Sequence, residues 1–181
     1  SPRDMIWKER IALSFEPPVE TCKGKIREVT LGTDKKVGGE TTFPFHLWEG
    51  EMPNAPMIAM EVYDEPQPDW PETVRKVYGD VMGDPVAWAK KCQDEFGADA
   101  ICLQLRSIDP NGSDASPESA AETVKKVYEA VSIPLIVYGT GTPDKDADVL
   151  KKVAEAMPDA NIPIGPVEES NHRLIGAAAM G

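Results

Sequence analysis

Acidic side chains stand directly after the first strongly apolar run of the sequence. The run Met57–Tyr63 ends in Asp64, Glu65 and Pro66, and α/β folds place ligand-binding groups just beyond the carboxyl ends of parallel strands. Asp64 is therefore a candidate for holding a ligand through its carboxylate oxygens. The same three residues would also make a well-solvated end for a strand, so both interpretations stay open.

Gln104 and Arg106 occupy the equivalent place after the second apolar run, which begins at Ala98. A glutamine amide and a guanidinium group can both hydrogen-bond to an amide, and the guanidinium can also bind an anion. Arg106 could instead form a salt bridge with Asp99 or Asp109.

A glycine-rich turn follows the third apolar run, Pro134–Tyr138. Gly139-Thr140-Gly141 would let the backbone approach a ligand closely, with amides of the next helix facing outward. The turn lacks the third glycine of a dinucleotide-binding fingerprint, and such turns also occur without ligands. Asn171 stands beyond a fourth run, Asn161–Val167, and completes the strand-end candidates.

The spacing of these runs indicates the element order that positions the candidates. Strands are expected to begin at Met57, Ala98, Pro134 and Asn161, with a helical pattern after each. Such alternation predicts right-handed crossovers and a parallel α/β sheet. Two architectures fit: about the first four βα units of a parallel (β/α) TIM-type barrel, or a four-stranded doubly wound sheet.

Two helices carry clear start signals. Asp84-Pro85 and Ser116-Pro117 each combine a capping side chain with proline at the first helical position. Trp88, Cys92 and Phe96 then fall on one face of the helix that Asp84 begins, which predicts that this face is buried.

The pattern along the chain predicts three segments. Residues 1–23 form an N-terminal arm with a short helix around Asp4–Ile11, residues 24–56 form a hairpin and a lid, and residues 57–181 form the N-terminal half of a barrel. The paired prolines Pro17-Pro18 stop any helix and predict an extended connection out of the arm.

The hairpin is predicted from alternating residues and glycines. Lys25–Leu31 alternates apolar and polar side chains, and Gly38-Gly39 resembles the turn into a second strand. Such a hairpin could cover one end of the sheet. In the lid that follows, His46 could bind a ligand, although a lone histidine among apolar neighbours is more often a hydrogen-bonded core residue.

Charge and composition exclude some classes of partner. The 181 residues carry a formal net charge of −12, and the scattered lysines and arginines argue against binding to nucleic acid. No apolar run reaches the length of a membrane span, and the first residues show no signal segment. We therefore expect a cytoplasmic protein with one sizeable core.

The three cysteines do not form a metal-binding pattern. Cys22, Cys92 and Cys102 are widely separated, with no Cys-x-x-Cys pair and no histidine at a ligand spacing. We expect no zinc site and no iron–sulfur cluster held by this chain alone. Cys92 and Cys102 are expected in the core.

Several segments share their order and spacing with one known family. They are Pro44-Phe45-His46, Glu49-Gly50-Glu51, Asn54-Ala55-Pro56, Ala59-Met60-Glu61-Val62, Pro68-Asp69-Trp70-Pro71, Asp84-Pro85, Trp88-Ala89-Lys90-Lys91-Cys92, Phe96-Gly97-Ala98-Asp99, Pro134-Leu135-Ile136-Val137 and Gly139-Thr140-Gly141. Together they resemble the small subunit of the corrinoid iron–sulfur protein, which is the delta subunit of the acetyl-CoA decarbonylase/synthase complex. The resemblance covers nearly the whole chain from Gly24 onward. It departs from the family in a shorter segment between Gly32 and Gly39 and in lacking the second half of the barrel.

The resemblance implies a TIM barrel similar to pterin-dependent methyltransferases, paired with a large (gamma) subunit that carries an iron–sulfur cluster and cobalamin. The carboxyl-terminal face of the barrel would cover this shared cobalamin. Methyl groups would pass between a methyl-tetrahydropterin, or its methyltransferase, and the acetyl-CoA synthase subunit. No residue of this chain would act as a catalyst or hold a metal. The residues expected to bind the cobalamin are Asp64, Gln104, Arg106, Gly139, Thr140, Gly141 and Asn171.

Two other functions stay open. A free-standing pterin-dependent methyltransferase would use carboxylates such as Asp64 to hold the pterin ring, and it would transfer methyl groups without a partner subunit. A purely structural subunit would hold a large complex together through its lid, its loops and its acidic surface.

Overall fold

The computed structural model describes residue 16 and residues 18–21 and 23–180. The expected helix around Asp4–Ile11 and the residue Cys22 lie outside the described residues. The chain divides into two compact units: Ser1–Arg27 with Gly38–Pro53, and Glu28–Val37 with Asn54–Gly181.

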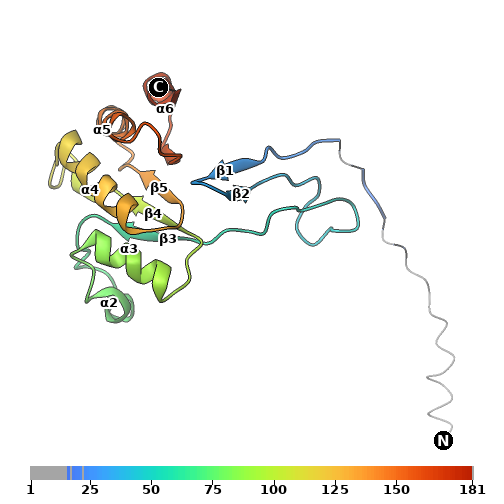
Figure 1. Ribbon diagram of the computed structural model, residues 1–181, viewed down its shortest axis with the longest axis horizontal. Helices are drawn as coiled ribbons and strands as arrows, with labels where there is room; N and C mark the ends of the chain where they lie inside the picture. Colours follow the sequence, from blue (N-terminus) through green and yellow to red (C-terminus); the bar gives the residue numbers. More distant parts are fainter. Residues whose placement is uncertain (1–15, 17, 22, 181) are drawn as a thin grey trace, which may run out of the picture. The chain divides into compact units, whose positions relative to one another are not determined.

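The second unit is built around a four-stranded parallel sheet (Figure 1). The strands β3 (Ala59–Tyr63), β4 (Ala100–Gln104), β5 (Leu135–Tyr138) and β6 (Ile164–Gly165) pair in the order of the sequence. Each expected apolar run therefore contributes one strand. The predicted parallel α/β sheet is confirmed.

The last strand is much shorter than the predicted run Asn161–Val167. Pro163 and Pro166 flank its two residues, and proline lacks the backbone N–H that a strand ladder requires. The carbonyl oxygen of a proline can still accept a hydrogen bond. Here the amide of Val137 donates to the Pro163 carbonyl oxygen at 2.9 Å. The prolines thus leave a minimal edge strand that is paired mainly through its acceptors.

The helices beside the sheet form one layer. α3 (Pro85–Asp94), α4 (Pro117–Ala130), α5 (Pro143–Ala156) and α6 (His172–Met180) each pack against the next one along the chain, on one side of the strands (Figure 1). A doubly wound sheet has helices on both faces and a reversal in strand order. The described residues show neither feature, so the doubly wound alternative does not describe this sheet. The described strands also form no closed barrel.

The helix layer covers one face of the sheet and creates the core. Val62, Leu103 and Val137 lie in register on neighbouring strands and are fully buried on this face. Burying apolar side chains in this way is the main driving force for folding. The other large, fully buried side chains are Trp88, Ile101, Leu105, Ile108, Val124, Val127, Leu135, Leu150 and Ile175.

The opposite face of the sheet has no helix over it in the described part of the chain. Glu61, Cys102 and Ile136 lie in register on this open face. Glu61 is exposed, and the other two side chains are half-buried. The sheet therefore presents one packed face and one open face.

Local capping fixes where the helices begin. The Asp84 carboxylate accepts hydrogen bonds from the amides of Val86 at 3.0 Å and Ala87 at 3.1 Å, and the Ser116 hydroxyl accepts from the amide of Ser119 at 3.2 Å. Each interaction satisfies an amide that has no partner within the helix. Both predicted starts are confirmed.

The predicted buried face of α3 is correct for Trp88 and Cys92 but not for Phe96. Phe96 follows the end of α3 and is 43% exposed. Its ring packs edge-on against Tyr78, with ring centroids 5.7 Å apart. Tyr78 ends α2 (Glu72–Tyr78), a short helix between β3 and α3.

The hairpin forms with a different turn from the one predicted. β1 (Val29–Leu31) pairs antiparallel with β2 (Lys35–Val37), so the turn is residues 32–34. Gly38-Gly39 instead follows β2, and in the first unit the Gly39 amide donates to the Ile26 carbonyl oxygen at 3.0 Å. The two glycines that were predicted to form the hairpin turn therefore lie after its second strand.

Side-chain contacts hold the hairpin at the amino-terminal edge of the sheet. The Asn161 amide donates to the carbonyl oxygens of Thr30 at 2.8 Å and Gly32 at 3.0 Å. Lys35 forms an ion pair of 2.8 Å with Asp99, which precedes β4. These contacts place the hairpin beside that end of the sheet.

Candidate functional site

The expected site residues gather along the edge where the strands end. Tyr63, Gln104 and Tyr138 are in register on neighbouring strands, so the loops that follow them begin at the same edge of the sheet. Open α/β sheets bind ligands at this edge. We call these loops the carboxyl-terminal rim and define it as residues 64–67, 104–116, 139–146 and 166–171.

Asp64 joins the loop after β3 to the loop after β4. Its carboxylate accepts hydrogen bonds from the Ser107 amide at 3.0 Å and the Ser107 hydroxyl at 2.5 Å. Burial raises the pKa of Asp64 above the ordinary aspartate value, and the bonds from Ser107 oppose that rise. Glu65 repeats the arrangement by accepting a hydrogen bond from the Ser113 hydroxyl. The two carboxylates therefore tie the loops together.

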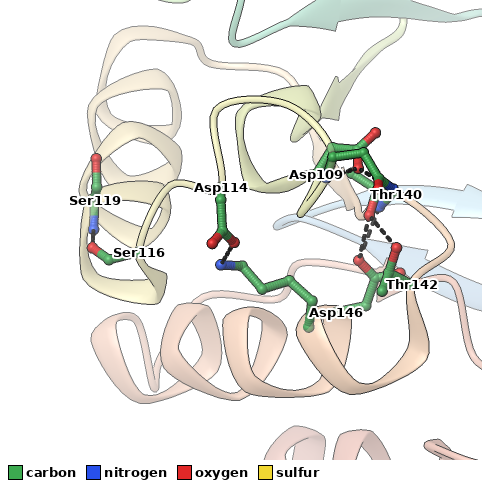
Figure 2. A network of polar contacts seen from close by, with 9 residues as sticks. Asp109, Asp114, Ser116, Ser119, Thr140, Thr142 and Asp146 are labelled. Atoms are coloured by element: carbon green, nitrogen blue, oxygen red, sulfur yellow. Dashed lines mark hydrogen bonds and ion pairs between the residues drawn. The ribbon is translucent and has the colours of Figure 1, made fainter.

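The glycine-rich turn after β5 is occupied by a side chain of the protein itself. The fully buried carboxylate of Asp146, in the first turn of α5, accepts from the amides of Thr140 at 2.9 Å and Gly141 at 2.8 Å (Figure 2). The amide of Gly139 donates to the Gly165 carbonyl oxygen at 2.7 Å. All three amides of the predicted ligand turn thus have partners inside the protein.

The close approach of Asp146 explains the first glycine of this turn. A β-carbon at position 139 would overlap the Asp146 carboxylate. The sequence reasoning missed Asp146, although a carboxylate soon after a Gly-x-Gly turn was a usable signal. The first turn of α5 contains two acids, Asp144 and Asp146. Only the folded structure shows that the second one accepts the hydrogen bonds of the turn.

Asn171 connects the loop after β6 to the start of α5. Its side-chain oxygen accepts from the Glu168 amide at 2.7 Å, and its nitrogen points at the carbonyl oxygens of Pro143 and Pro166, each 3.5 Å away. Only 2% of the residue is exposed. The Asn171 side chain therefore makes its hydrogen bonds within the protein.

A further tie crosses from the loop after β4 to α5. Lys145, in the first turn of α5, forms an ion pair of 2.5 Å with Asp114 of that loop. Only 19% of the Lys145 side chain is exposed, which makes the pair less screened than a fully solvated one. Neighbouring loops of the rim are thus connected by polar contacts from β3 to β6.

Gln104 and Arg106 are the strand-end candidates with unused hydrogen-bonding groups. The Gln104 side-chain nitrogen donates to Glu61 at 3.2 Å, which leaves its amide oxygen without a donor among the described residues. Arg106 is exposed and forms no ion pair with a described residue. The alternative salt bridges do not form, since Asp99 pairs with Lys35 and Asp109 accepts from the Asn111 amide at 2.8 Å.

The thiol on the open face is a weak nucleophile. Burial, with a contribution from the charge of Glu61, raises the pKa of Cys102 above the ordinary cysteine value. Burial raises the pKa of Cys92 to about 11. Since the thiolate is the reactive form, both side chains act as packing groups near neutral pH.

The two histidines also have local partners. His46 lies 3.1 Å from the Glu49 carboxylate through Nδ1, and His172 Nδ1 lies 2.8 Å from the Glu169 carbonyl oxygen. Across the described residues, no group of three or more His, Cys, Asp and Glu side chains could hold a metal ion. A search of the same residues finds no helix that is long and apolar enough to cross a membrane.

Comparison with known proteins places this chain in a family. A family model described as "CO dehydrogenase/acetyl-CoA synthase delta subunit" matches residues 28–181. The chain is similar to the acetyl-CoA decarbonylase/synthase complex subunit delta of Methanocaldococcus jannaschii, with 40% identity over 152 residues, covering 79% of this chain and 37% of that protein.

Two further relatives agree. The delta subunit of Methanothermobacter thermautotrophicus is 38% identical over 149 residues, which cover 80% of this chain and 38% of the relative. That of Archaeoglobus fulgidus is 38% identical over 157 residues, which cover 81% of this chain and 34% of the relative. The chain thus spans little more than a third of each relative's length. It belongs to the family of CO dehydrogenase/acetyl-CoA synthase delta subunits.

Proposed function

We propose that this chain helps a corrinoid iron–sulfur protein to bind and cover cobalamin within the acetyl-CoA decarbonylase/synthase complex. Membership of the delta-subunit family supports its place in that complex. The cobalamin would be shared with the large (gamma) subunit, and its cobalt supplies the methyl-transfer chemistry when it is bound. The contribution of this chain is to position the ligand and to exclude water.

The Arg106 guanidinium has no ion-pair partner among the described residues, and this is the observation that carries the proposal. It stands on the carboxyl-terminal rim close to Gln104, whose amide oxygen also lacks a donor among the described residues. A corrin ring bears carboxamide groups at its periphery. A guanidinium can donate to their oxygens, and a glutamine oxygen can accept from their nitrogens. The residues present therefore fit the edge of such a ring.

The other predicted binding residues support the rim from within. The Gly139-Thr140-Gly141 amides are held by Asp146 and Gly165, and Asn171 and Asp64 connect neighbouring loops. Binding groups need partners that fix their own positions. We propose that these residues keep the rim rigid, while Arg106 and Gln104 make the contacts through their side chains.

The sheet supports a barrel as the complete fold. Strands that pair in sequence order, a single helix layer and an open inner face are what the first four βα units of a (β/α)8 barrel would show. We propose that residues 57–181 are this first half, preceded by an arm (1–23) and by a hairpin and lid (24–56). The acetyl-CoA synthase subunit and a methyl-tetrahydropterin, or its methyltransferase, are the proposed functional partners in the cytoplasm.

The test is to purify the full chain together with the large subunit and to record the visible absorption of the bound corrinoid. We expect Arg106→Gln to weaken corrinoid retention by about tenfold, the loss of one charge-assisted contact. Arg75→Gln, which removes an exposed arginine from α2, is the matched control and should leave retention unchanged.

Two results would point to the other functions. If the chain transfers methyl from a methyl-tetrahydropterin without any partner, it is a free-standing methyltransferase. If the complex assembles and corrinoid retention and spectrum are the same with Arg106→Gln as with Arg75→Gln, the chain has a structural role and the covering role is refuted.

A further inference from the structure

The segment Gly38–Pro53 of the first unit exposes several large apolar side chains. Phe43, Phe45, Leu47 and Trp48 are 76%, 90%, 62% and 50% exposed. Large aromatic side chains present about 150–250 Å² each, so these four expose roughly 500 Å² of apolar surface. That is as large as the biggest patch on an ordinary monomer, and such patches mark interaction sites.

Hydrogen bonds close this loop at its base and fix its shape. The Thr41 amide donates to the Glu51 carbonyl oxygen at 3.0 Å, and the Glu51 amide donates to the Thr41 hydroxyl at 2.9 Å. The Glu49 carboxylate lies 3.1 Å from His46 Nδ1 and accepts from the Glu20 amide, also at 3.1 Å. The apolar side chains are therefore displayed on an ordered loop, which lowers the entropy cost of binding.

The backbone at Phe45 is held in a conformation that aromatic residues avoid. Its φ angle is 67°, in the left-handed region, where a bulky side chain is strained. Such strain persists only where the surroundings enforce it, and it is concentrated at binding and functional sites. The strained backbone of Phe45 carries a phenyl ring that is almost fully exposed to solvent.

Charge defines the kind of surface that this loop can meet. Gly38–Pro53 contains Glu40, Glu49 and Glu51 but no lysine or arginine, and the whole chain has a formal net charge of −12. A complementary surface is apolar at its centre and positive at its rim. A pocket of about 950 Å³ beside the loop, lined by Ile26, Phe43, Trp48 and Met52 among others, could receive an apolar side chain in return.

We propose that Gly38–Pro53 is a docking loop for another protein subunit of the complex, one with an apolar cavity edged by lysine and arginine. Phe45 is its anchor, and Phe43, Leu47 and Trp48 surround that anchor. This inference rests on the proposed place of the chain in a multisubunit complex. It concerns a surface separate from the residues of the carboxyl-terminal rim.

The test measures the affinity of the full chain for the purified large subunit and, separately, for the purified acetyl-CoA synthase subunit. Phe45→Gly removes the ring and accepts the left-handed backbone without strain, so folding should be preserved. We expect it to weaken binding to one of the two subunits by about 30-fold, the loss typical of an anchor residue. Glu51→Gln should weaken the same binding by a few-fold at low salt only.

The control is Leu174→Ala, which removes another exposed apolar side chain (58% exposed) from α6 and should leave binding unchanged. Equal binding by wild type and Phe45→Gly would overturn the docking loop and leave the proposed function standing. If neither subunit binds the wild type, both proposals fail.

Two other results would identify a different occupant. If the wild type forms a dimer and Phe45→Gly does not, a second copy of the chain is the occupant. If Phe45→Gly lowers the thermal stability strongly, the ring packs within the chain. Either result would overturn the proposed partner.

Discussion

The carboxylate of Asp146 accepts a hydrogen bond from the amide of Thr140, which lies six residues earlier, at 2.9 Å. A buried acid of the protein thereby occupies the positive amino-terminal end of α5, where an anionic ligand would otherwise bind. The turn before α5 is thus an internally satisfied part of the rim. We therefore propose that it holds neighbouring groups of the rim in place.

Removing the Asp146 carboxylate should destabilise the protein strongly. Asp146→Ala removes the acceptor of the amides of half-buried Thr140 and exposed Gly141, and a hydrogen bond to a charged group contributes about 1.5–3 kcal/mol. We expect the free energy of unfolding in urea to fall by about 3 kcal/mol in total. Asp144→Asn, at an exposed acid of the same helical turn, is the control and should change it by less than about 0.5 kcal/mol. Equal losses would show that Asp146 acts only through the helix dipole.

Glycine 139 should tolerate no side chain. Gly139→Ala places a methyl group where the Asp146 carboxylate lies, and we expect a loss of about 2–4 kcal/mol from overpacking and broken hydrogen bonds. Gly176→Ala is the matched control, because its β-carbon meets no neighbour within 4 Å on α6. Alanine favours helix by about 1 kcal/mol over glycine, so thermal unfolding should separate the variants in opposite directions. A stable Gly139→Ala protein would contradict the described position of Asp146.

The stability of the protein should depend on pH through Asp64. Burial raises the folded-state pKa of this carboxyl above its value in the unfolded chain. Between the two pKa values the folded state binds more protons than the unfolded state, so stability is greatest below the ordinary aspartate pKa and falls as pH rises through the raised value. Urea unfolding from about pH 3.5 to 7 should show this fall in wild type relative to Asp64→Asn.

The comparison of wild type with Asp64→Asn cancels the contributions of the other titrating groups, because these groups are present in both proteins. A difference between the two unfolding free energies that stays constant over this pH range would show that Asp64 has an ordinary pKa. A difference that changes in the opposite direction would show that the hydrogen bonds from Ser107 outweigh burial.

Features fixed by local interactions were predictable from the sequence. Asp84 and Ser116 cap their helices because a side chain two or three residues from an unpaired amide needs no tertiary partner. The parallel sheet followed from the alternation of apolar runs and helical patterns. The edge that gathers Asp64, Gln104 and Gly139 followed from the parallel direction of the strands, although none of this tests what they bind.

Features chosen by distant contacts were not predictable. Gly32, Gly38 and Gly39 all adopt positive φ angles, so local sequence does not reveal which of them turns the hairpin. The contacts of Gly32 with Asn161, far along the chain, decide it. Asp146 lies only six residues from Thr140, and it was missed because the first turn of α5 contains a second acid, Asp144, from which local sequence does not distinguish it.

The open face of the sheet predicts how Cys102 should react. In this chain the thiol is half-buried on a face without a helix layer, and its raised pKa keeps it protonated near neutral pH. We expect a Cys22→Ser version of the chain to label with a thiol reagent at a single site, slowly at pH 7 and faster above the ordinary cysteine pKa of about 8.5. Cys102→Ser in the same background should abolish labelling, because Cys92 is fully buried and has a pKa of about 11.

If the sheet is the first half of a barrel, adding the missing strands should protect this thiol. A chimera that appends the remaining two thirds of a relative would place Cys102 inside the barrel, where only global or sub-global opening exposes it. Each 1.4 kcal/mol of opening free energy slows labelling tenfold, so even a modest 3 kcal/mol would slow it by about 100-fold. Labelling at the same rate in the chain and in a folded chimera would show that the open face stays uncovered, and the barrel proposal would then fail.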